Sequence, residues 1–217
     1  MAVQTITIPA VLPAGDVVAV DVSEAEYMAQ YAEQRYEWAQ GVVIKMSPVS
    51  LIHDKLVAYI RNLFEAYFAL RSIGEVVGDP FVMRLAAAES NREPDLQVIL
   101  GDNRANLKDT YMDGPADICM EVVSPGSVAV DYGEKLAEYE KGGVGEYWII
   151  DPIRRSCLFY RLTDQDLYSP HLPSANESYT TPRLPGFVLH VPTLWQQPLP
   201  DYGAVWQAVQ TMLQADD

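Results

Sequence analysis

The sequence predicts a mixed α/β fold in which helices cover a central sheet. Residues 116–152 provide the first observation, because an apolar run at 118–123, a helical pattern and a second apolar run at 147–150 follow one another. A strand, a helix and a strand in this order form the unit that builds parallel, covered sheets. A long amphipathic pattern over 50–71 and a series of strand-like runs after residue 152 are the second and third observations. We therefore expect a mostly parallel sheet that antiparallel strands extend.

The N-terminal part of the chain predicts an arm, a short helix and a hairpin. Residues 1–22 are rich in proline and apolar residues without a clear period, and we interpret them as an arm. Ser23 and Glu26 have the spacing of a capping box, so a helix is expected to begin there. Two strand-like runs lie on either side of a Gln-Gly pair within 36–47, and this pattern predicts a hairpin.

A long helix and several short strands are expected in the middle of the chain. Apolar residues recur every three or four positions over 50–71, which is typical of one buried helical face; they are Ile52, Leu56, Ile60, Leu63, Tyr67 and Leu70. Short strands are expected at 75–77 and 81–85, and a buried strand at 96–100. Residues 101–114 are polar, and we interpret them as a functional or mobile loop.

The last third of the chain predicts strands that extend the sheet and then a helix. The strand-like segments are 157–162, 166–169, and the stretches around 179 and 185–189; a short helical turn at 192–195 and a helix over 202–213 follow. The chain contains no internal repeat and no clear linker. We therefore expect a single domain over 1–217, with an arm at 1–22, a core at about 23–191 and a C-terminal helical extension at 192–217.

Composition narrows the class of protein. The chain has 217 residues, of which 49% are hydrophobic, so a sizeable core is expected and global disorder is excluded. No apolar run is long enough to span a bilayer, and the N-terminus lacks the basic start and cleavage site of a secretory signal. Two cysteines without metal-type spacing suit a reducing compartment. These observations predict a cytoplasmic protein with no membrane partner. The formal net charge of −15 counts against a broad nucleic-acid-binding surface, although a local basic cleft remains compatible with it.

Two carboxylates are the first candidates for a functional site. Glu121 lies inside a buried-looking run, where an unpaired carboxylate costs several kcal/mol, so it requires a partner, a metal or a cleft. Asp95 stands at the start of the preceding buried strand, and successive strands are often neighbours. Two carboxylates from neighbouring strands suit a hard cation such as Mg²⁺. A salt bridge between the sheet and a helix is the alternative interpretation of Glu121.

Several motifs in fixed order resemble a known family. PDL at 94–96, EVVSP at 121–125 and GVGEYWIIDP at 143–152 resemble the Uma-two family, which is described as putative endonucleases. YEWAQGVVIKMSP at 36–48 and LPGF at 184–187 are further similarities, and together the motifs span about 23–191. The family belongs to the PD-(D/E)xK restriction-endonuclease-like superfamily. The resemblance implies a central mixed sheet flanked by helices, with additional antiparallel strands. It also implies DNA cleavage that depends on Mg²⁺, or on Mn²⁺ as the alternative metal, and a homodimer.

The resemblance also implies roles for particular residues. Asp95 matches the aspartate of the motif and Glu121 its glutamate, so both are expected to be catalytic residues and metal ligands. The lysine of the superfamily normally lies two residues after the glutamate, where this chain has Val123. In the family this lysine has moved to the next helix, which points to Lys135. The alternative for Lys135 is a surface ion pair with Asp131, four residues earlier, worth only about 0.3–0.5 kcal/mol.

Two further residues are candidates for support of the site. Glu37 lies in the first strand of the expected hairpin, and His53 lies near the start of the long helix. Both fall within similarities to the family, but position alone assigns neither a definite role.

Three functions follow from these observations. The first is a metal-dependent endonuclease that acts on DNA through Asp95, Glu121 and Lys135. The second is a nuclease fold with weak or no activity that serves as a binding or interaction module, and the charge of −15 and the valine at position 123 support it. The third is a metal-dependent hydrolase of a different substrate.

Overall fold

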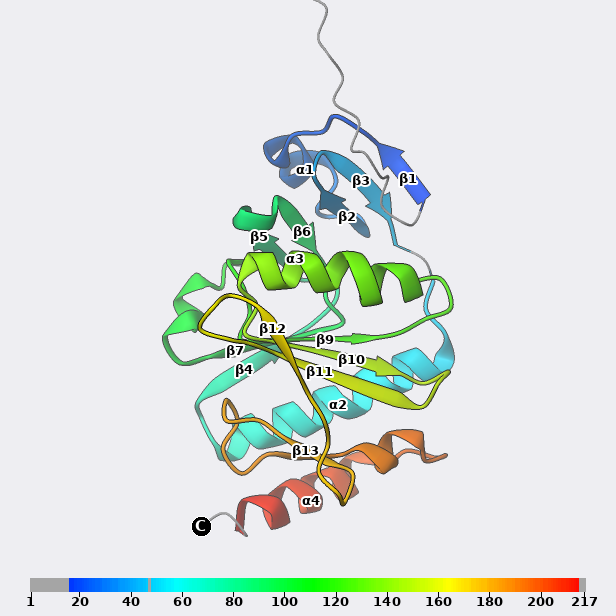
Figure 1. The fold of residues 1–217 in the computed structure, drawn as a ribbon, viewed down its shortest axis with the longest axis vertical. Coiled ribbons are helices and arrows are strands. Elements are labelled where there is room, and N and C mark those ends of the chain that lie inside the picture. The colour runs from blue at the N-terminus through cyan, green and yellow to red at the C-terminus, as the bar shows by residue number, and fades with distance from the viewer. Residues whose placement is uncertain (1–15, 47, 215–217) are drawn as a thin grey trace, which may run out of the picture.

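The computed structural model describes residues 16–46 and 48–214, so most of the expected arm lies outside the described residues. Its elements are stacked in layers around a central sheet (Figure 1). Helix α2 (Leu51–Leu70) covers one face of this sheet, and α4 (Tyr202–Gln214) packs against α2. Helix α3 (Lys135–Gly142) covers the other face. A second sheet and α1 (Glu24–Gln30) lie beyond α3. The mixed α/β class expected from the sequence is confirmed.

The central sheet has six strands in the order β12-β11-β10-β9-β7-β4. Their bounds are β4 (Gly74–Val77), β7 (Leu96–Leu100), β9 (Ile118–Val122), β10 (Glu146–Asp151), β11 (Ser156–Leu162) and β12 (Tyr168–His171). Strands β9 and β10 pair in parallel, and the other neighbours in this sheet pair antiparallel. The expectation of a mostly parallel sheet is therefore wrong. A parallel pair needs a crossover segment, and α3 supplies one between β9 and β10, whereas short turns join β10, β11 and β12.

The second sheet was not expected from the sequence. It also has six strands, in the order β1-β3-β2-β6-β5-β8. Their bounds are β1 (Asp16–Ala19), β2 (Tyr36–Ala39), β3 (Val42–Lys45), β5 (Val82–Leu85), β6 (Ser90–Arg92) and β8 (Tyr111–Asp113). The expected hairpin is present as β2 and β3, which pair antiparallel. Its turn places both Gln40 and Gly41 at positive φ, as the two central residues of a type I′ turn require.

Three other expectations need correction. The polar segment at 101–114 is not a plain loop, because it contains a 3₁₀ turn, Gly101–Asn106, and strand β8. Strands β13 (Ser178–Thr180) and β14 (Val188–His190) pair with each other in a separate two-stranded sheet and do not extend the central one. Apolar side chains of this segment join the core on the α2 side, which explains why it leaves the plane of the central sheet. Leu70 was expected on the buried face of the long helix, but its side chain is 40% exposed.

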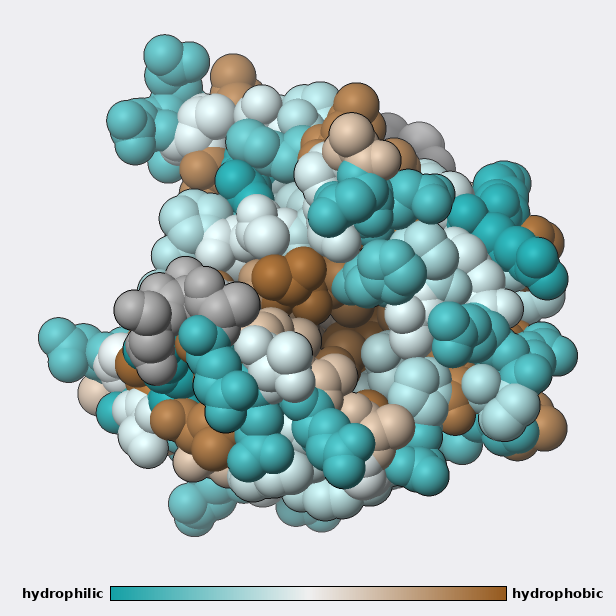
Figure 2. Space-filling view, turned by 90° about the horizontal axis from the view of Figure 1, so that it is seen from below, coloured by the Kyte–Doolittle hydropathy of each residue, from teal (hydrophilic) through white to brown (hydrophobic). Residues whose placement is uncertain are grey.

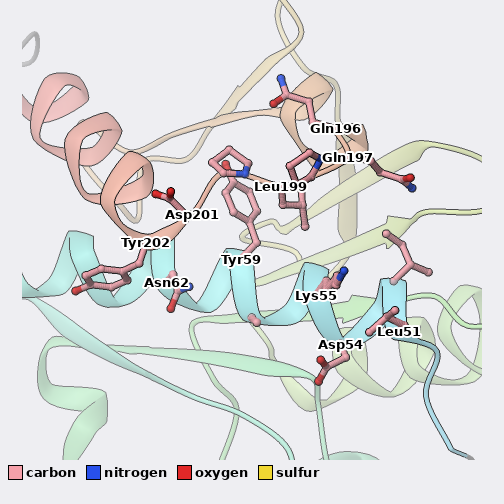
Figure 3. Close-up of a pocket in the computed structure, with 14 residues that line it drawn as sticks. Leu51, Asp54, Lys55, Tyr59, Asn62, Gln196, Gln197, Leu199, Asp201 and Tyr202 are labelled. Atoms are coloured by element: carbon pink, nitrogen blue, oxygen red, sulfur yellow. The ribbon is translucent and has the colours of Figure 1, made fainter.

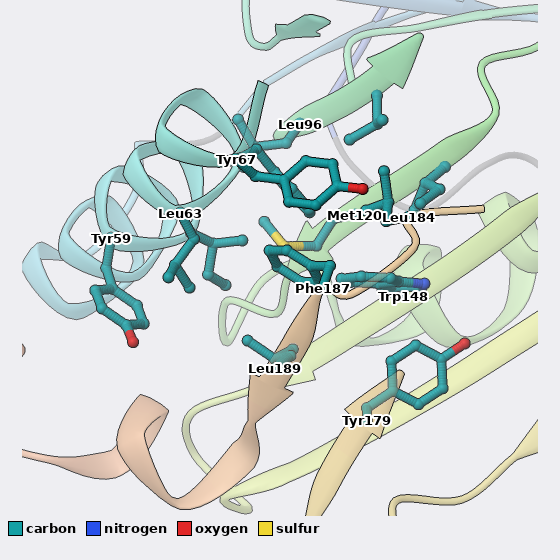
Figure 4. Packing of buried hydrophobic residues seen from close by; sticks show 14 of the residues in the cluster. Tyr59, Leu63, Tyr67, Leu96, Met120, Trp148, Tyr179, Leu184, Phe187 and Leu189 are labelled. Carbon is teal, nitrogen blue, oxygen red and sulfur yellow. The ribbon is translucent and has the colours of Figure 1, made fainter. Parts of the chain in front are cut away.

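The main core lies between α2 and the central sheet (Figure 4). Ser50 caps α2 by accepting a hydrogen bond from the backbone N–H of His53 at 3.3 Å. Within the helix, Leu56, Ile60, Leu63 and Tyr67 are buried as their spacing predicts. They pack in one cluster with Trp148 and Phe187. This packing holds the first turn of α2, and therefore His53, in a fixed position beside the sheet.

Candidate functional site

The pairing of β7 with β9 brings the two predicted carboxylates together. The strands are antiparallel, with Leu96 opposite Met120, and continuing this register by one residue places Asp95 opposite Glu121. Leu96 and Met120 face the α2 side of the sheet, where they join the main core. Because side chains alternate along a strand, Asp95 and Glu121 project toward the other face, which α3 covers.

All five sequence-predicted residues line one small pocket of about 100 Å³. Asp95 precedes β7, Glu121 lies in β9 and Lys135 begins α3, while Glu37 comes from β2 and His53 from α2. The two sheets and two helices thus each contribute a side chain. Lys45, Ser124, Ser127 and Asp131 also line this pocket. We refer to it below as the acidic pocket.

Lys135 lies among three carboxylates inside the acidic pocket. Its Nζ atom is 2.9 Å from Oε1 of Glu121, 3.4 Å from Oε1 of Glu37 and 3.9 Å from Oδ1 of Asp131. Lys135 is 5% exposed and Asp131 is 2% exposed, so the alternative of an ion pair on the helix surface does not describe this geometry. Tyr139, one helical turn later, donates its hydroxyl proton to the same oxygen of Glu121 at 2.8 Å.

A π-helical turn, Val130–Glu134, precedes α3 and was not foreseen from the spacing of the residues. Such turns are rare and are frequent at functional sites. At its end Lys135 is directed at the acidic pocket. Gly143, in the left-handed region at φ 85°, ends the helix before β10 begins.

Carboxylates outnumber cations in the acidic pocket, and their pKa values shift accordingly. Burial raises the pKa of Glu121 well above its usual range, and the nearby charges of Asp95 and Asp131 add to this effect, although Lys135 opposes it. Burial likewise raises the pKa of Asp131 to about 6. Burial alone would lower the pKa of Lys135, but the carboxylates of Glu121, Glu37 and Asp131 raise it above its ordinary value. The ammonium group therefore remains charged, and the pocket as a whole favours the binding of further positive charge.

A buried arginine completes the network and was missed in the sequence. Arg92 is fully buried and donates hydrogen bonds to Glu37 at 2.9 Å and to both oxygens of Glu138 at 2.7 Å. Glu37 also accepts the backbone N–H of Glu93 at 3.1 Å. Arg92 and Lys135 lower the pKa of Glu37 against the opposing effect of burial. Glu37 is thus an ionised link between the two cations.

His53 contacts the other metal-ligand candidate. Its Nε2 atom is 3.0 Å from Oδ2 of Asp95, and the same oxygen accepts the backbone N–H of Val122 at 2.7 Å. Burial alone would lower the pKa of His53, but its hydrogen bond to Asp95 raises it. The His53 side chain and the backbone N–H of Val122 therefore hold the Asp95 carboxylate through its Oδ2 atom.

The donors in the acidic pocket fit a hard cation through two carboxylates. In the described part of the chain, no group of three or more His, Cys, Asp or Glu side chains is arranged to hold a metal ion. Mg²⁺ is commonly bound through one or two carboxylates, with water and substrate oxygens completing the shell. The hydrogen bonds of Asp95 described above use its Oδ2 atom, and those of Glu121 use its Oε1 atom. A cation bound by this pair would therefore complete its shell with water and substrate.

A larger pocket lies elsewhere and contains none of the predicted residues. It has a volume of about 730 Å³ and lies between α2 and residues 196–202. Tyr59 and Asn62 of α2 lie beside the segment that carries Leu199 (Figure 3). Seen from the side of α4, the surface is hollowed and apolar side chains gather in the hollow (Figure 2). Of these two pockets, the smaller acidic pocket contains the network of charged side chains, so we assign the candidate site there.

The fold is of the restriction-endonuclease-like class, as a solved structure and a family match indicate. Among solved structures, a putative nuclease belonging to DUF820 from Anabaena variabilis is similar in fold, with a TM-score of 0.62 and 12% identity over 87% of this chain and 99% of that chain. The Uma2 family, described as "putative restriction endonuclease", matches residues 23–192. The chain belongs to this family, as its motifs indicated, and the family description supports a nuclease function in general. No match was found among curated proteins.

Among the described residues, no helix is both long enough and apolar enough to span a membrane.

Proposed function

We propose that this protein is a metal-dependent endonuclease that hydrolyses phosphodiester bonds in DNA. One observation carries the proposal: side chains from two sheets and two helices converge on the acidic pocket. Asp95, Glu121 and Lys135, the three residues to which the resemblance assigns catalytic roles, are among them. A purely structural ion pair would need one carboxylate and one cation. The acidic pocket instead contains four carboxylates, those of Glu37, Asp95, Glu121 and Asp131.

Asp95 and Glu121 are the residues that would hold Mg²⁺ or Mn²⁺. When bound, the cation supplies a nucleophilic water of lowered pKa and polarises the phosphoryl oxygens. The Asp95 carboxylate is held for this task by His53 and by the Val122 amide. Glu121 is held by Lys135 and Tyr139, which both contact one of its oxygens.

Lys135 acts as a charged donor in this proposal. Its pKa is raised by the surrounding carboxylates, so it keeps its proton and is unsuited to act as a general base. Its ammonium orients Glu121 and stabilises negative charge that develops on the phosphate. Glu37 and Arg92 keep this ammonium in position, because Glu37 contacts Lys135 on one side and Arg92 on the other.

Cleavage of supercoiled plasmid tests the proposal. The wild-type protein should nick plasmid in the presence of Mg²⁺ or Mn²⁺ and lose activity in EDTA. Asp95→Asn and Glu121→Gln should be inactive, while Lys141→Met, on the exposed side of α3, should cleave like the wild type. Retention of cleavage in Asp95→Asn under conditions where the protein is folded would contradict the proposal. Gel filtration with light scattering, with and without DNA, tests the expected homodimer.

A binding module without activity is the second candidate, and one observation favours it. Lys135 is engaged by three carboxylates, so its ammonium reaches a phosphate only if these contacts rearrange. Metal binding by calorimetry, lost in Asp95→Ala, separates the two functions, because a module of this kind needs no cation in the acidic pocket. Cleavage of a phosphodiester other than DNA, with intact plasmid, would indicate a hydrolase with a different substrate.

A further inference from the structure

The turn between β10 and β11, residues 152–155, lies at the same end of the central sheet as the acidic pocket. Strands β9 and β10 are parallel, with Glu121 opposite Ile149, so both strands end at one edge of the sheet. Strand β10 ends at Asp151, and the turn follows directly. Helix α2 also begins at this end (Figure 1). A DNA duplex is much larger than a pocket of about 100 Å³, so a duplex that reaches the acidic pocket would extend over this edge.

The turn is held firmly by Asp151. Its Oδ1 atom accepts the backbone N–H groups of Ile153 at 2.9 Å and of Arg154 at 2.8 Å. Its Oδ2 atom accepts the Arg154 guanidinium at 2.7 Å and the hydroxyl of Tyr132 at 2.9 Å. The same guanidinium lies over the ring of Tyr132, 5.7 Å from its centre. Tyr132 follows Asp131 in the π-helical turn, so the β10–β11 turn is fixed beside the segment that lines the acidic pocket.

Two further cations at this end are exposed and have no carboxylate partner in the described part of the chain. They are Arg155, at the end of the turn, and Lys55 of α2. Arg155 has a φ of 50°, in the left-handed region that glycine occupies at lower cost. Ile52 and residues 196–197 line a cavity with Arg155 and also the larger pocket with Lys55. The two cations therefore lie on one continuous surface, and Ile52 joins it to His53 in the acidic pocket.

We propose that this surface contacts the phosphates of duplex DNA beside the scissile bond. It consists of five residues, which we call the flanking surface: Lys55, Arg154, Arg155, Gln196 and Gln197. The proposal rests on the endonuclease function proposed above, because that function brings DNA to the acidic pocket. Lysine and arginine neutralise phosphates and release their counterions, and glutamine amides donate hydrogen bonds to phosphate oxygens.

Carboxylates close to the flanking surface weaken this attraction without cancelling it. Asp54 is exposed next to Lys55 on α2 and lines the larger pocket with it. Arg154 is paired with Asp151, but that carboxylate is fully buried, whereas 57% of the arginine side chain is exposed. DNA at this edge would therefore meet the guanidinium and not its partner. The flanking surface thus adds to the attraction of a cation in the acidic pocket and orients the duplex across it.

Fluorescence anisotropy with a short labelled DNA duplex tests this inference. The titration is done in EDTA over a series of salt concentrations, so that the affinity reports the side chains of the protein alone. Lys55→Gln and Arg155→Gln should each reduce the slope of log affinity against log salt by about 0.9, and weaken binding roughly eightfold at about 0.1 M salt. Asp54→Asn should tighten binding, because it removes a negative charge beside Lys55. Lys141→Gln is the matched control, since Lys141 is exposed in the last turn of α3, and it should bind like the wild type.

Two outcomes would overturn the inference: no binding of the duplex to the wild type at low salt, or an unchanged affinity and salt slope in the Lys55→Gln and Arg155→Gln double variant. A changed elution volume of the double variant in gel filtration, with unchanged affinity for DNA, would assign the flanking surface to a protein partner instead. The result is separable from the endonuclease function. Intact plasmid with the wild type, but a reduced slope in the double variant, would reject cleavage and retain the DNA contact. Cleavage by the wild type without any change of slope would do the reverse.

Discussion

Replacing Lys135 with methionine removes the central cation of the acidic pocket and keeps the packing of its stem. Glu37 would keep Arg92 as its partner, but Glu121 would keep only the hydroxyl of Tyr139. Removing one partner of a buried ion pair costs about 3–5 kcal/mol. Because Glu121 already has a raised pKa, protonation of its carboxylate should recover part of this cost. We expect a net loss of about 2–3 kcal/mol, or a fall of roughly 4–12 °C in melting temperature.

The assay is thermal unfolding in EDTA, followed by circular dichroism, on a double-mutant cycle. Lys135→Met should be destabilised as described, and Lys135→Met with Glu121→Gln should recover much of the loss, because Glu121, the closest carboxylate partner of the lysine, then carries no charge that needs a cation. The coupling energy should be about 1–3 kcal/mol. Lys141→Met is the matched control on α3, where the side chain is exposed, and it should change stability by less than about 0.5 kcal/mol.

The reasoning fails if Lys135→Met melts within about 2 °C of the wild type, a change of no more than about 1 kcal/mol. It also fails if Glu121→Gln brings no recovery. Either result would mean that Lys135 does not compensate Glu121, and the catalytic role proposed for this lysine would lose its structural basis.

Three further predictions concern neighbouring groups. Asp95→Asn preserves the shape that contacts Val122 and His53, so its melting temperature in EDTA should stay within about 4 °C of the wild type, a change of about 1 kcal/mol, while calorimetric Mg²⁺ binding disappears; a larger fall would identify Asp95 as a structural partner of His53. Glu93 has a folded-state pKa of about 8, above its unfolded value, so its contribution to stability is present at low pH and is lost as the pH rises toward 8. In urea unfolding, the free energy of unfolding of the wild type should therefore fall by up to about 4 kcal/mol more than that of Glu93→Gln between about pH 5 and pH 9. Equal falls would show that Glu93 does not keep its proton in the folded protein. Arg92→Met leaves Glu37 and Glu138 without their shared cation and should cost about 3–5 kcal/mol in the same assay, and a loss below about 1 kcal/mol would show that Arg92 is dispensable.

Local signals in the sequence predicted many of the elements that hold the candidate site. The apolar spacing over 50–71 predicted α2, and the Gln-Gly pair predicted the β2–β3 hairpin. Glu121 could be singled out because an apolar run makes a lone carboxylate conspicuous. Each of these features depends on residues that are close together in the chain, so it can be recognised without knowledge of the fold.

The second sheet and the Arg92 network could not be predicted in the same way. Strands β6 and β8 are three residues long, too short for an alternating pattern, and β6 consists of Ser, Asn and Arg. Fully buried arginines are rare, so Arg92 in a polar stretch gave no sign of burial. The two carboxylates that compensate the buried charge of Arg92 are those of Glu37 in β2 and Glu138 in α3, which are distant from it in sequence. One member of the network could have been recognised from its position in the sequence. Glu138 lies three residues after Lys135, so the two side chains are neighbours on one face of the helix.

The formal charge of −15 weighs less against a phosphodiester substrate than its size suggests. Among the residues that the structure describes, seven acidic side chains are buried; they are Glu37, Glu93, Asp95, Glu121, Asp131, Glu146 and Asp151. Several of them are paired with buried cations or have pKa values raised toward protonation, so they contribute little field at the surface. The excess of carboxylates in the acidic pocket is also what a divalent cation requires. Once bound, such a cation would change the local charge by two units at the place where a phosphate would lie. Affinity for DNA should then depend on the metal more than on exposed lysines and arginines, and the acidity that counts against a broad DNA-binding surface is compatible with a narrow catalytic one.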